Sequence, residues 1–176
     1  MKTSIAAAIA GIASAILMTS AAALAADKPT DAQIAHIAYT AGDIDVKAAK
    51  QALEKSKTES VRAFANDMVR DHTAVNEKAL ALVKKLHVTP QDNETSQALV
   101  KGAEAKHAEL EKLSGAAFDK AYIDNEVAYH KAVLAALKNT LIPSTSNHEL
   151  KTLLETGVKI FEGHEQHAEQ LAAKVD

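Results

Sequence analysis

The chain has 176 residues, with 20 Lys or Arg against 23 Asp or Glu, so its net charge is −3 at pH 7. It contains no cysteine, which excludes disulfides, thiolate metal sites and thiol catalysis. Only 3% of the residues are aromatic and Gly and Pro are scarce, a composition typical of packed helices. Lysine and glutamate are interspersed along the chain, so no basic patch indicates nucleic-acid binding.

The N-terminal segment predicts a cleaved secretory signal peptide. No residue is charged between Ile5 and Leu24, and the stretch ends in Ala23-Leu24-Ala25, the small-x-small pattern that signal peptidases recognise. The alternative is an uncleaved membrane anchor, because about 20 apolar residues can span a bilayer. The good cleavage site favours removal of residues 1–25. We therefore expect residues 26–176 to form one periplasmic or secreted domain with no stable membrane insertion.

Capping and breaking signals divide the mature chain into helices. Thr30-x-x-Gln33 is a capping box that begins the first helix, and Ser146-x-x-Glu149 is a capping box for the last one. Loops are predicted at residues 88–93 and 143–146, where Pro and small polar residues gather. The predicted helices cover about residues 30–55, 59–86, 95–112, 117–141 and 146–174.

The apolar residues of the four long helices recur at alternating steps of four and three. We call each such row of positions an apolar stripe, and in the second helix it consists of Val61, Ala65, Met68, His72, Val75, Ala79, Leu82 and Leu86. This spacing is typical of helices that pack at a shallow angle. Four such helices with short connections predict an all-α, antiparallel four-helix bundle with one extra shorter helix before the third. Four aromatic residues are expected to be buried: Phe64, Phe118, Tyr122 and Phe161.

Each of the four stripes is interrupted by one residue that can ligate a metal ion. These residues are Asp45, His72, His130 and His164. A buried imidazole or carboxylate without a partner costs on the order of a few kcal/mol, so these groups need one another, water or an ion. One core histidine alone is more often a hydrogen-bonded structural residue. Three histidines and a carboxylate on four separate helices favour a shared site for zinc, iron, manganese or copper.

The level of each residue along its helix tests this hypothesis. Asp45 and His72 are almost equally far from the turn at Thr58, so they should face each other across that hairpin. His130 lies about 14 residues before the next turn and His164 about 19 after its centre. At 1.5 Å per residue the mismatch is roughly 7 Å, which places His164 nearer the level of Glu126. A compact site of four ligands therefore needs either a staggered loop or Glu126 as a further ligand.

The Glu-x-x-His signature that di-iron enzymes carry on two helices is not met. Glu104-x-x-His107 occurs once, on the shorter helix, where a solvated surface pair is expected. Asp71, beside His72, either orients a neighbouring ligand or is solvated. The chain has no Gly-rich phosphate loop, no nucleophile elbow and no serine placed near a base, so catalysis of any kind is the least favoured function.

Several motifs together resemble one family. They are Ala41-Gly42, Val61-Arg62-Ala63-Phe64-Ala65, Met68-Val69-Arg70-Asp71-His72, Phe118-Asp119-x-x-Tyr122 leading to His130, and His164. This set is similar to the exported domain-of-unknown-function family 4142, over about residues 30–172. The resemblance implies a ferritin-like fold and export, and it implies glutamate at the position that Asp45 occupies. It supplies no established activity.

Two functions from different classes are consistent with these observations. The first is a non-catalytic envelope or stress interaction protein, in which the core histidines form a hydrogen-bonded network without an ion. The second is a metal-binding or metal-sensing bundle that uses the core His and Asp residues. The identity of any protein partner is not encoded in a recognisable motif.

Overall fold

The computed structural model describes residues 28–175, and the predicted signal peptide at residues 1–25 lies outside them. The described part of the chain is helical and contains no β-strand, which confirms the predicted all-α class. No helix within it is long and apolar enough to cross a membrane. The elements are α1 (Asp31–Lys55), α2 (Glu59–Lys85), α3 (Glu94–Glu111), α4 (Gly115–Ala136), the π-helical turn η1 (Leu137–Leu141), α5 (Ile142–Ser144) and α6 (His148–Ala172).

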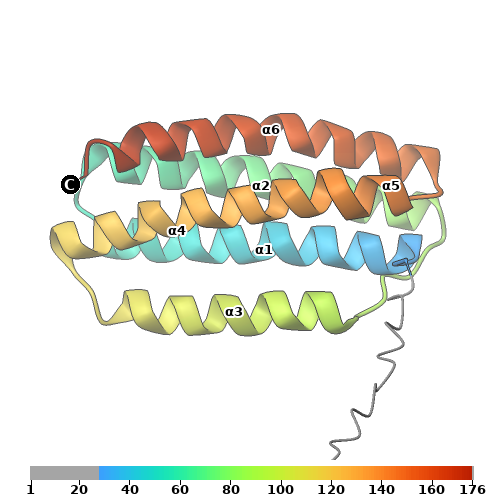
Figure 1. Cartoon of the computed structure of the whole chain (residues 1–176), viewed down its shortest axis with the longest axis horizontal. Coiled ribbons are helices and arrows are strands. Elements are labelled where there is room, and N and C mark those ends of the chain that lie inside the picture. The colour runs from blue at the N-terminus through green and yellow to red at the C-terminus, as the bar shows by residue number, and fades with distance from the viewer. Residues whose placement is uncertain (1–27, 176) are drawn as a thin grey trace, which may run out of the picture.

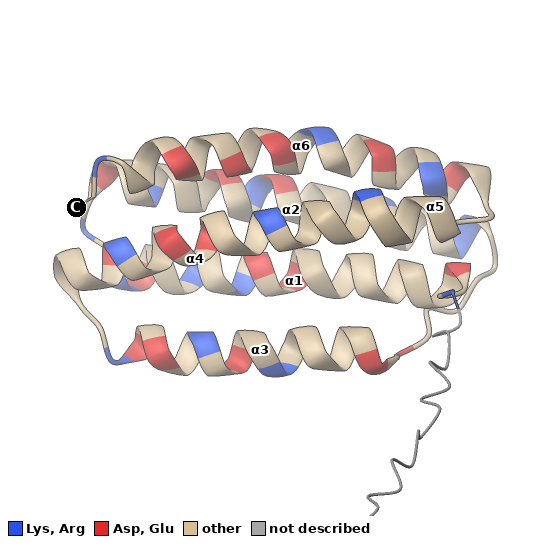
Figure 2. Ribbon diagram, viewed as in Figure 1, with Lys and Arg blue, Asp and Glu red and all other residues tan. Residues whose placement is uncertain are grey.

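Four long helices lie side by side, and each runs opposite to the helix that it packs against most closely (Figure 1). The most extensive contacts join α1 to α2 and α4 to α6, while α2 also packs on α6 and α1 on α4. Helix α3 lies outside this group against α1 and carries the chain from the end of α2 to the start of α4 (Figure 1). Charged residues of both signs are spread along the long helices (Figure 2).

The ends of α1 and α6 are joined by capping contacts. Thr30 and Gln33 form the predicted capping box at the start of α1. The predicted cap of α6 is wrong by one residue, because the Asn147 side chain accepts the hydrogen bonds from the first turn. The backbone N–H of Ser146 instead donates to Asp31 Oδ1 at 2.8 Å. The first residue of α1 is thus hydrogen-bonded to the backbone just before α6, which stabilises the position of these two helix N-termini relative to each other.

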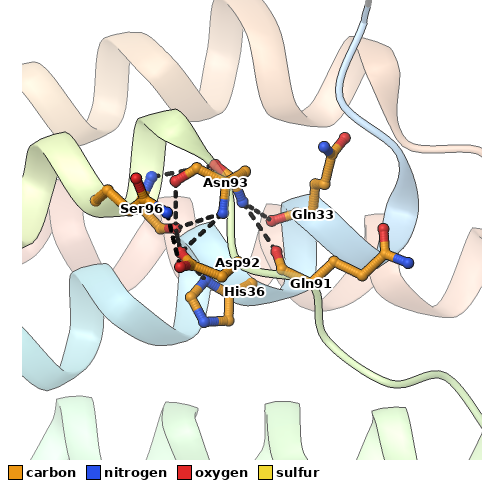
Figure 3. Close-up of polar contacts among 7 residues, drawn as sticks. Gln33, His36, Gln91, Asp92, Asn93 and Ser96 are labelled. Carbon is orange, nitrogen blue, oxygen red and sulfur yellow. Dashed lines mark hydrogen bonds and ion pairs between the residues drawn. The ribbon is translucent and has the colours of Figure 1, made fainter.

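A polar cap fixes the start of α3 to α1 (Figure 3). Asn93 Oδ1 accepts from the backbone of Ser96 at 3.1 Å, and its Nδ2 donates to the carbonyl oxygen of Gln33 at 3.4 Å. Asp92 accepts from Ser96 Oγ at 2.7 Å and lies 3.9 Å from His36 Nδ1. His36 therefore belongs to this surface cap and not to the interior.

The other end of α3 is also tied to α1. Gln51 Nε2 donates to the carbonyl oxygen of His107 at 3.1 Å and to Glu111 Oε2 at 3.0 Å. Lys55 Nζ donates to the carbonyl oxygen of Glu111 at 2.6 Å, and Leu110 is buried beneath. Helix α3 is therefore held against α1 at both of its ends.

Buried apolar residues form two clusters, one toward each end of the long helices. The predicted burial of the aromatic residues is confirmed, since Phe64, Phe118 and Tyr122 are inaccessible and Phe161 is 7% exposed. The first three belong to the cluster built on Val61, Met68 and Ile123, whereas Phe161 belongs to the cluster at the opposite end. Between the two clusters lies a group of polar side chains.

Candidate functional site

The structure brings together all five residues that the sequence singles out as candidate ligands. We call Asp45, His72, Glu126, His130 and His164 the central polar cluster. Asp45 comes from α1, His72 from α2, Glu126 and His130 from α4, and His164 from α6. None of the five is more than 7% exposed. Each helix presents its ligand-type residue from the same stripe that carries its apolar core residues, so packing of the stripes forces the polar groups to meet.

Asp45 is the centre of the cluster. Its Oδ2 lies 2.9 Å from His72 Nε2 and 3.4 Å from His130 Nε2. The first contact confirms that Asp45 and His72 face each other across the α1–α2 hairpin. One carboxylate oxygen is therefore shared between imidazoles from two other helices.

His130 is held by its own helix. Its Nδ1 lies 2.9 Å from the backbone carbonyl oxygen of Glu126, one turn earlier, and 3.6 Å from Glu126 Oε2. A carbonyl oxygen only accepts hydrogen bonds, so this contact places the proton on Nδ1. The Nε2 lone pair of His130 then faces Asp45 and is available to an ion.

His164 is oriented by the residue that precedes His72. Its Nε2 lies 3.0 Å from Asp71 Oδ2, which leaves Nδ1 buried without a hydrogen-bond partner. Asp71 is half-buried and also accepts from Arg70. Of the two roles predicted for Asp71, the structure therefore supports orientation of a neighbouring side chain.

The predicted 7 Å mismatch between His130 and His164 is wrong. The two rings lie 5.6 Å apart, centroid to centroid. The helical backbone continues through η1 and α5 to Ser144, past Pro143, so the turn is centred near Ser146 rather than earlier. This later turn brings His130 and His164 to similar distances from it, and His164 joins the cluster at the level of His130.

The three imidazoles form a compact triangle beside Phe161. The ring centroid of His72 lies 5.7 Å from that of His130 and 5.1 Å from that of His164. One nitrogen from each of the three lies within 4.8 Å of one nitrogen of the others. Phe161 stacks on His72 at 4.8 Å with an interplanar angle of 11° and closes the side of the cluster that faces the second apolar cluster.

The two carboxyl groups have opposite protonation tendencies. Burial by itself raises the pKa of Asp45, but His72, His130 and the Glu126 carboxyl outweigh it and lower the pKa to about 2. Burial, and then the negative charge of Asp45, raises the pKa of Glu126 well above its ordinary value. Glu126 therefore favours the protonated form, while Asp45 favours the charged form.

Two of the imidazoles, those of His130 and His164, favour the neutral form. Burial lowers the pKa of His130 in spite of the attraction of Asp45. Burial also lowers the pKa of His164 to about 4, although Asp71 opposes the shift. Neutral imidazole is the form that ligates a metal ion.

Several polar atoms of the cluster have no aligned hydrogen-bond partner. They are both carboxylate oxygens of Asp45, both ring nitrogens of His72, Glu126 Oε2, His130 Nε2 and His164 Nδ1. Among residues 28–175, no lysine or arginine forms an ion pair with Asp45 or Glu126. The Asp45 charge is thus buried with imidazoles as its main neighbours, an arrangement that is costly without a cation.

Sequence reasoning did not place three further residues beside the cluster, although it predicted that one of them, Tyr122, is buried. Tyr129 donates from its hydroxyl to the carbonyl oxygen of Ala41 at 2.9 Å, beside His130. Asn76 lies one turn after His72 and packs directly on Gly42. Tyr122, one turn before Glu126, has a buried hydroxyl without a partner. The spacing of four residues from a candidate ligand is the signal that identifies Asn76 and Tyr122.

The fold and the site define a class: an all-helical protein whose long helices enclose three histidines and two carboxyl groups. Residues 17–171 match the family model described as Domain of unknown function (DUF4142), so the chain belongs to this family. No curated protein and no solved structure matches the chain. The motifs that carried the resemblance surround the central polar cluster, since Gly42, Asp71, His72 and His130 all lie in it or against it.

Proposed function

We propose that this protein is an exported, ferritin-like four-helix bundle that binds a divalent transition-metal ion in the central polar cluster. The observation that carries the proposal is a pair of overlapping buried ligand groups, one of His72, His130 and His164 and one of Asp45, Glu126 and His130. Asp45 links the two groups through its contacts with His72 and His130. Several ring nitrogens and carboxylate oxygens there have no aligned hydrogen-bond partner, and no lysine or arginine among residues 28–175 forms an ion pair with Asp45. A bound cation would coordinate these nitrogen and oxygen atoms and would also balance the Asp45 charge.

The ligand chemistry narrows the class of ion. Three imidazoles with carboxylate, and no thiolate anywhere in the chain, suit zinc, iron, manganese or copper. Two imidazoles bound to one ion at metal–nitrogen distances of about 2.0–2.1 Å have ring centroids roughly 5 Å apart. The three centroid distances of 5.1 to 5.7 Å are close to this value. Small rotations of the rings would therefore be enough to engage one ion.

The competing function is a non-catalytic envelope or stress interaction protein with an ion-free core. Two contacts favour it, because His130 donates to the Glu126 carbonyl oxygen and His164 contacts Asp71. Each of these contacts uses only one of the two ring nitrogens, and the other nitrogen points into the cluster without a partner. In metal sites, a hydrogen bond on the outer nitrogen is also what orients a ligating histidine. The same contacts therefore support metal binding.

The deciding experiment is metal analysis of protein purified without an affinity tag. Apoprotein prepared with a chelator is loaded separately with zinc, copper, manganese or iron, and the bound metal is counted after gel filtration. We expect about one ion per chain for at least one metal, and loss of that ion in His72→Ala. His148→Ala is the matched control, because His148 is exposed at the start of α6. No stoichiometric binding of any metal, or equal uptake by both variants, would favour the ion-free interaction protein.

Export is proposed from the apolar leader and its Ala23-x-Ala25 site, which lie outside the described residues. The intact mass of protein recovered from outside the cytoplasm should begin at Ala26 or within a few residues of it. Recovery of a chain that retains Met1 would contradict the cleavage.

A further inference from the structure

The two halves of the apolar core are packed differently. In the cluster around Phe64 and Met68, nearly every buried side chain is inaccessible to solvent. In the cluster around Phe161, the corresponding side chains keep small exposed fractions, such as 9% for Val83 and 4% for Leu150. The second half of the core is therefore less completely enclosed than the first.

Residues of this second cluster line a cavity of about 910 Å³ that is partly open to solvent. Residues of α1, α2, α3, α4, η1 and α6 line it. Most of its wall is apolar, with Ala41, Val83, Leu154 and Gly157 among its residues, and the wall also includes the exposed Ala132 and Thr140. Charged side chains occur only at its rim, where Lys28 and Glu94 lie near the start of α1 and of α3. Water in such a space has few hydrogen-bond partners, so an apolar guest would be favoured over it.

We propose that this cavity is a binding site for a single hydrocarbon chain, with the polar end of the ligand at the rim near Lys28 and Glu94. The volume lies in the range of small-molecule sites. The apolar wall suits a flexible chain, and the rim carries one charge of each sign, so it selects neither an anionic nor a cationic head group. This site is independent of the proposed metal centre, because none of the three histidines and neither carboxyl group of the central polar cluster lines it.

Phe161 forms the boundary between the two sites. One part of its ring lines the cavity, and its face stacks on His72. The chain would therefore end against Phe161 and would not enter the polar cluster. A binding site closed by an aromatic ring has a defined depth, so affinity should depend on chain length up to a limit.

Binding can be measured with the uncharged fluorescent probe N-phenyl-1-naphthylamine, since the protein has no tryptophan to interfere. The probe should gain fluorescence with the protein and be displaced by the alcohols octanol, decanol and dodecanol. Each added methylene should tighten binding by up to about fourfold, the factor expected for burying one CH₂ group. Dodecanoate should bind within about tenfold of dodecanol, because the rim carries both signs of charge.

Two glycines of α6 provide a matched pair of variants. A side chain at Gly157 would lie 3.7 Å from Phe161 Cε2 and fill the cavity, whereas a side chain at Gly163 meets nothing within 4 Å. Gly157→Leu should weaken binding of the probe at least tenfold, and Gly163→Leu should leave it unchanged. If circular dichroism shows that Gly157→Leu is unfolded, Ala79→Phe fills the cavity from α2, with the exposed Ala81→Phe as its control.

Three results would overturn the proposal: no fluorescence gain with the wild-type protein, equal binding by a folded cavity-filling variant and its control, or no dependence on chain length. Phospholipid vesicles distinguish a free single-chain ligand from a membrane. Displacement of the probe by two-chain vesicles, with none by dodecanol, would also contradict the site described here. His72→Ala should bind the probe like the wild type, so failure of the metal proposal leaves this result unaffected.

Discussion

Asp71 Oδ2 lies 3.0 Å from Nε2 of His164, and this contact determines which ring nitrogen of His164 faces the central polar cluster. The hydrogen bond to a carboxylate fixes the proton on Nε2 and leaves the Nδ1 lone pair directed inward. Asp71 directly precedes His72 in α2, so one helical segment supplies both a candidate ligand and the group that orients another.

Asp71→Asn should weaken metal binding without abolishing it. Loss of a carboxylate that orients a ligating histidine typically lowers metal affinity about 10- to 100-fold. Titration of the apoprotein with the metal found to bind gives the affinity. Asp67→Asn is the control, because Asp67 lies on the same helix and pairs with Arg70 but contacts no member of the cluster. An affinity equal to that of the wild type would show that His164 is not a ligand or is oriented by other contacts.

The apoprotein should lose thermal stability as the pH falls from about 7 toward 4. The pKa of His164 is about 4 in the folded protein, below its ordinary value of 6.5. Between these values the unfolded chain binds the proton more readily, so acidification favours unfolding. The lowered pKa of His130 acts in the same direction, while the raised pKa of Glu126 acts in the opposite one.

His164→Gln isolates the contribution of that histidine. Its melting temperature should vary less between pH 7 and 5 than that of the wild type, whereas the exposed control His148→Gln should follow the wild type. Differential scanning calorimetry in chelator makes the comparison. A pH dependence in His164→Gln as steep as in the wild type would contradict the lowered pKa of His164.

Thr58→Val should destabilise the fold. The Thr58 hydroxyl donates a hydrogen bond to Asp119 Oδ2 at 2.5 Å, and the Asp119 side chain is buried. Thr58 makes no side-chain capping bond to α2, so the loss reflects Asp119 alone. A buried carboxylate left without its donor costs about 1–3 kcal/mol. Urea unfolding gives this value, and the exposed Thr73→Val on α2 should stay within about 0.5 kcal/mol of the wild type.

Gly42→Ala and Gly102→Ala should change stability in opposite directions. A Cβ at Gly42 would lie 2.3 Å from Asn76 Oδ1, so the buried Asn76 would have to move, at a cost of about 1–3 kcal/mol. A Cβ at Gly102 meets nothing within 4 Å, and alanine is the better helix former by about 0.8–1.0 kcal/mol. Thermal unfolding of both variants measures the difference. Stabilisation in both would show that Asn76 moves away freely.

The helices and the identity of the candidate ligands were predictable from the sequence, because both depend on local periodicity. The step of three and four residues identifies the inward face of a helix whatever its partner is. A polar residue on that face, such as His72 or His130, must therefore be buried once the helices pack. The level of Asp45 relative to His72 was also predictable, since a short turn fixes the register of a hairpin.

Only the tertiary structure decided the position of His164, the role of Asp71 and the shape of the core. The α4–α6 connection contains a π-helical turn and a proline within helical backbone, and propensity alone placed that turn too early. Whether Asp71 met water or an imidazole depended on the rotation of α6 against α2. The partly open cavity bounded by Phe161 is lined by residues from several helices that do not fill the space between them. Such a space depends on the sum of side-chain volumes across helices, and the pattern along one helix carries no information about it.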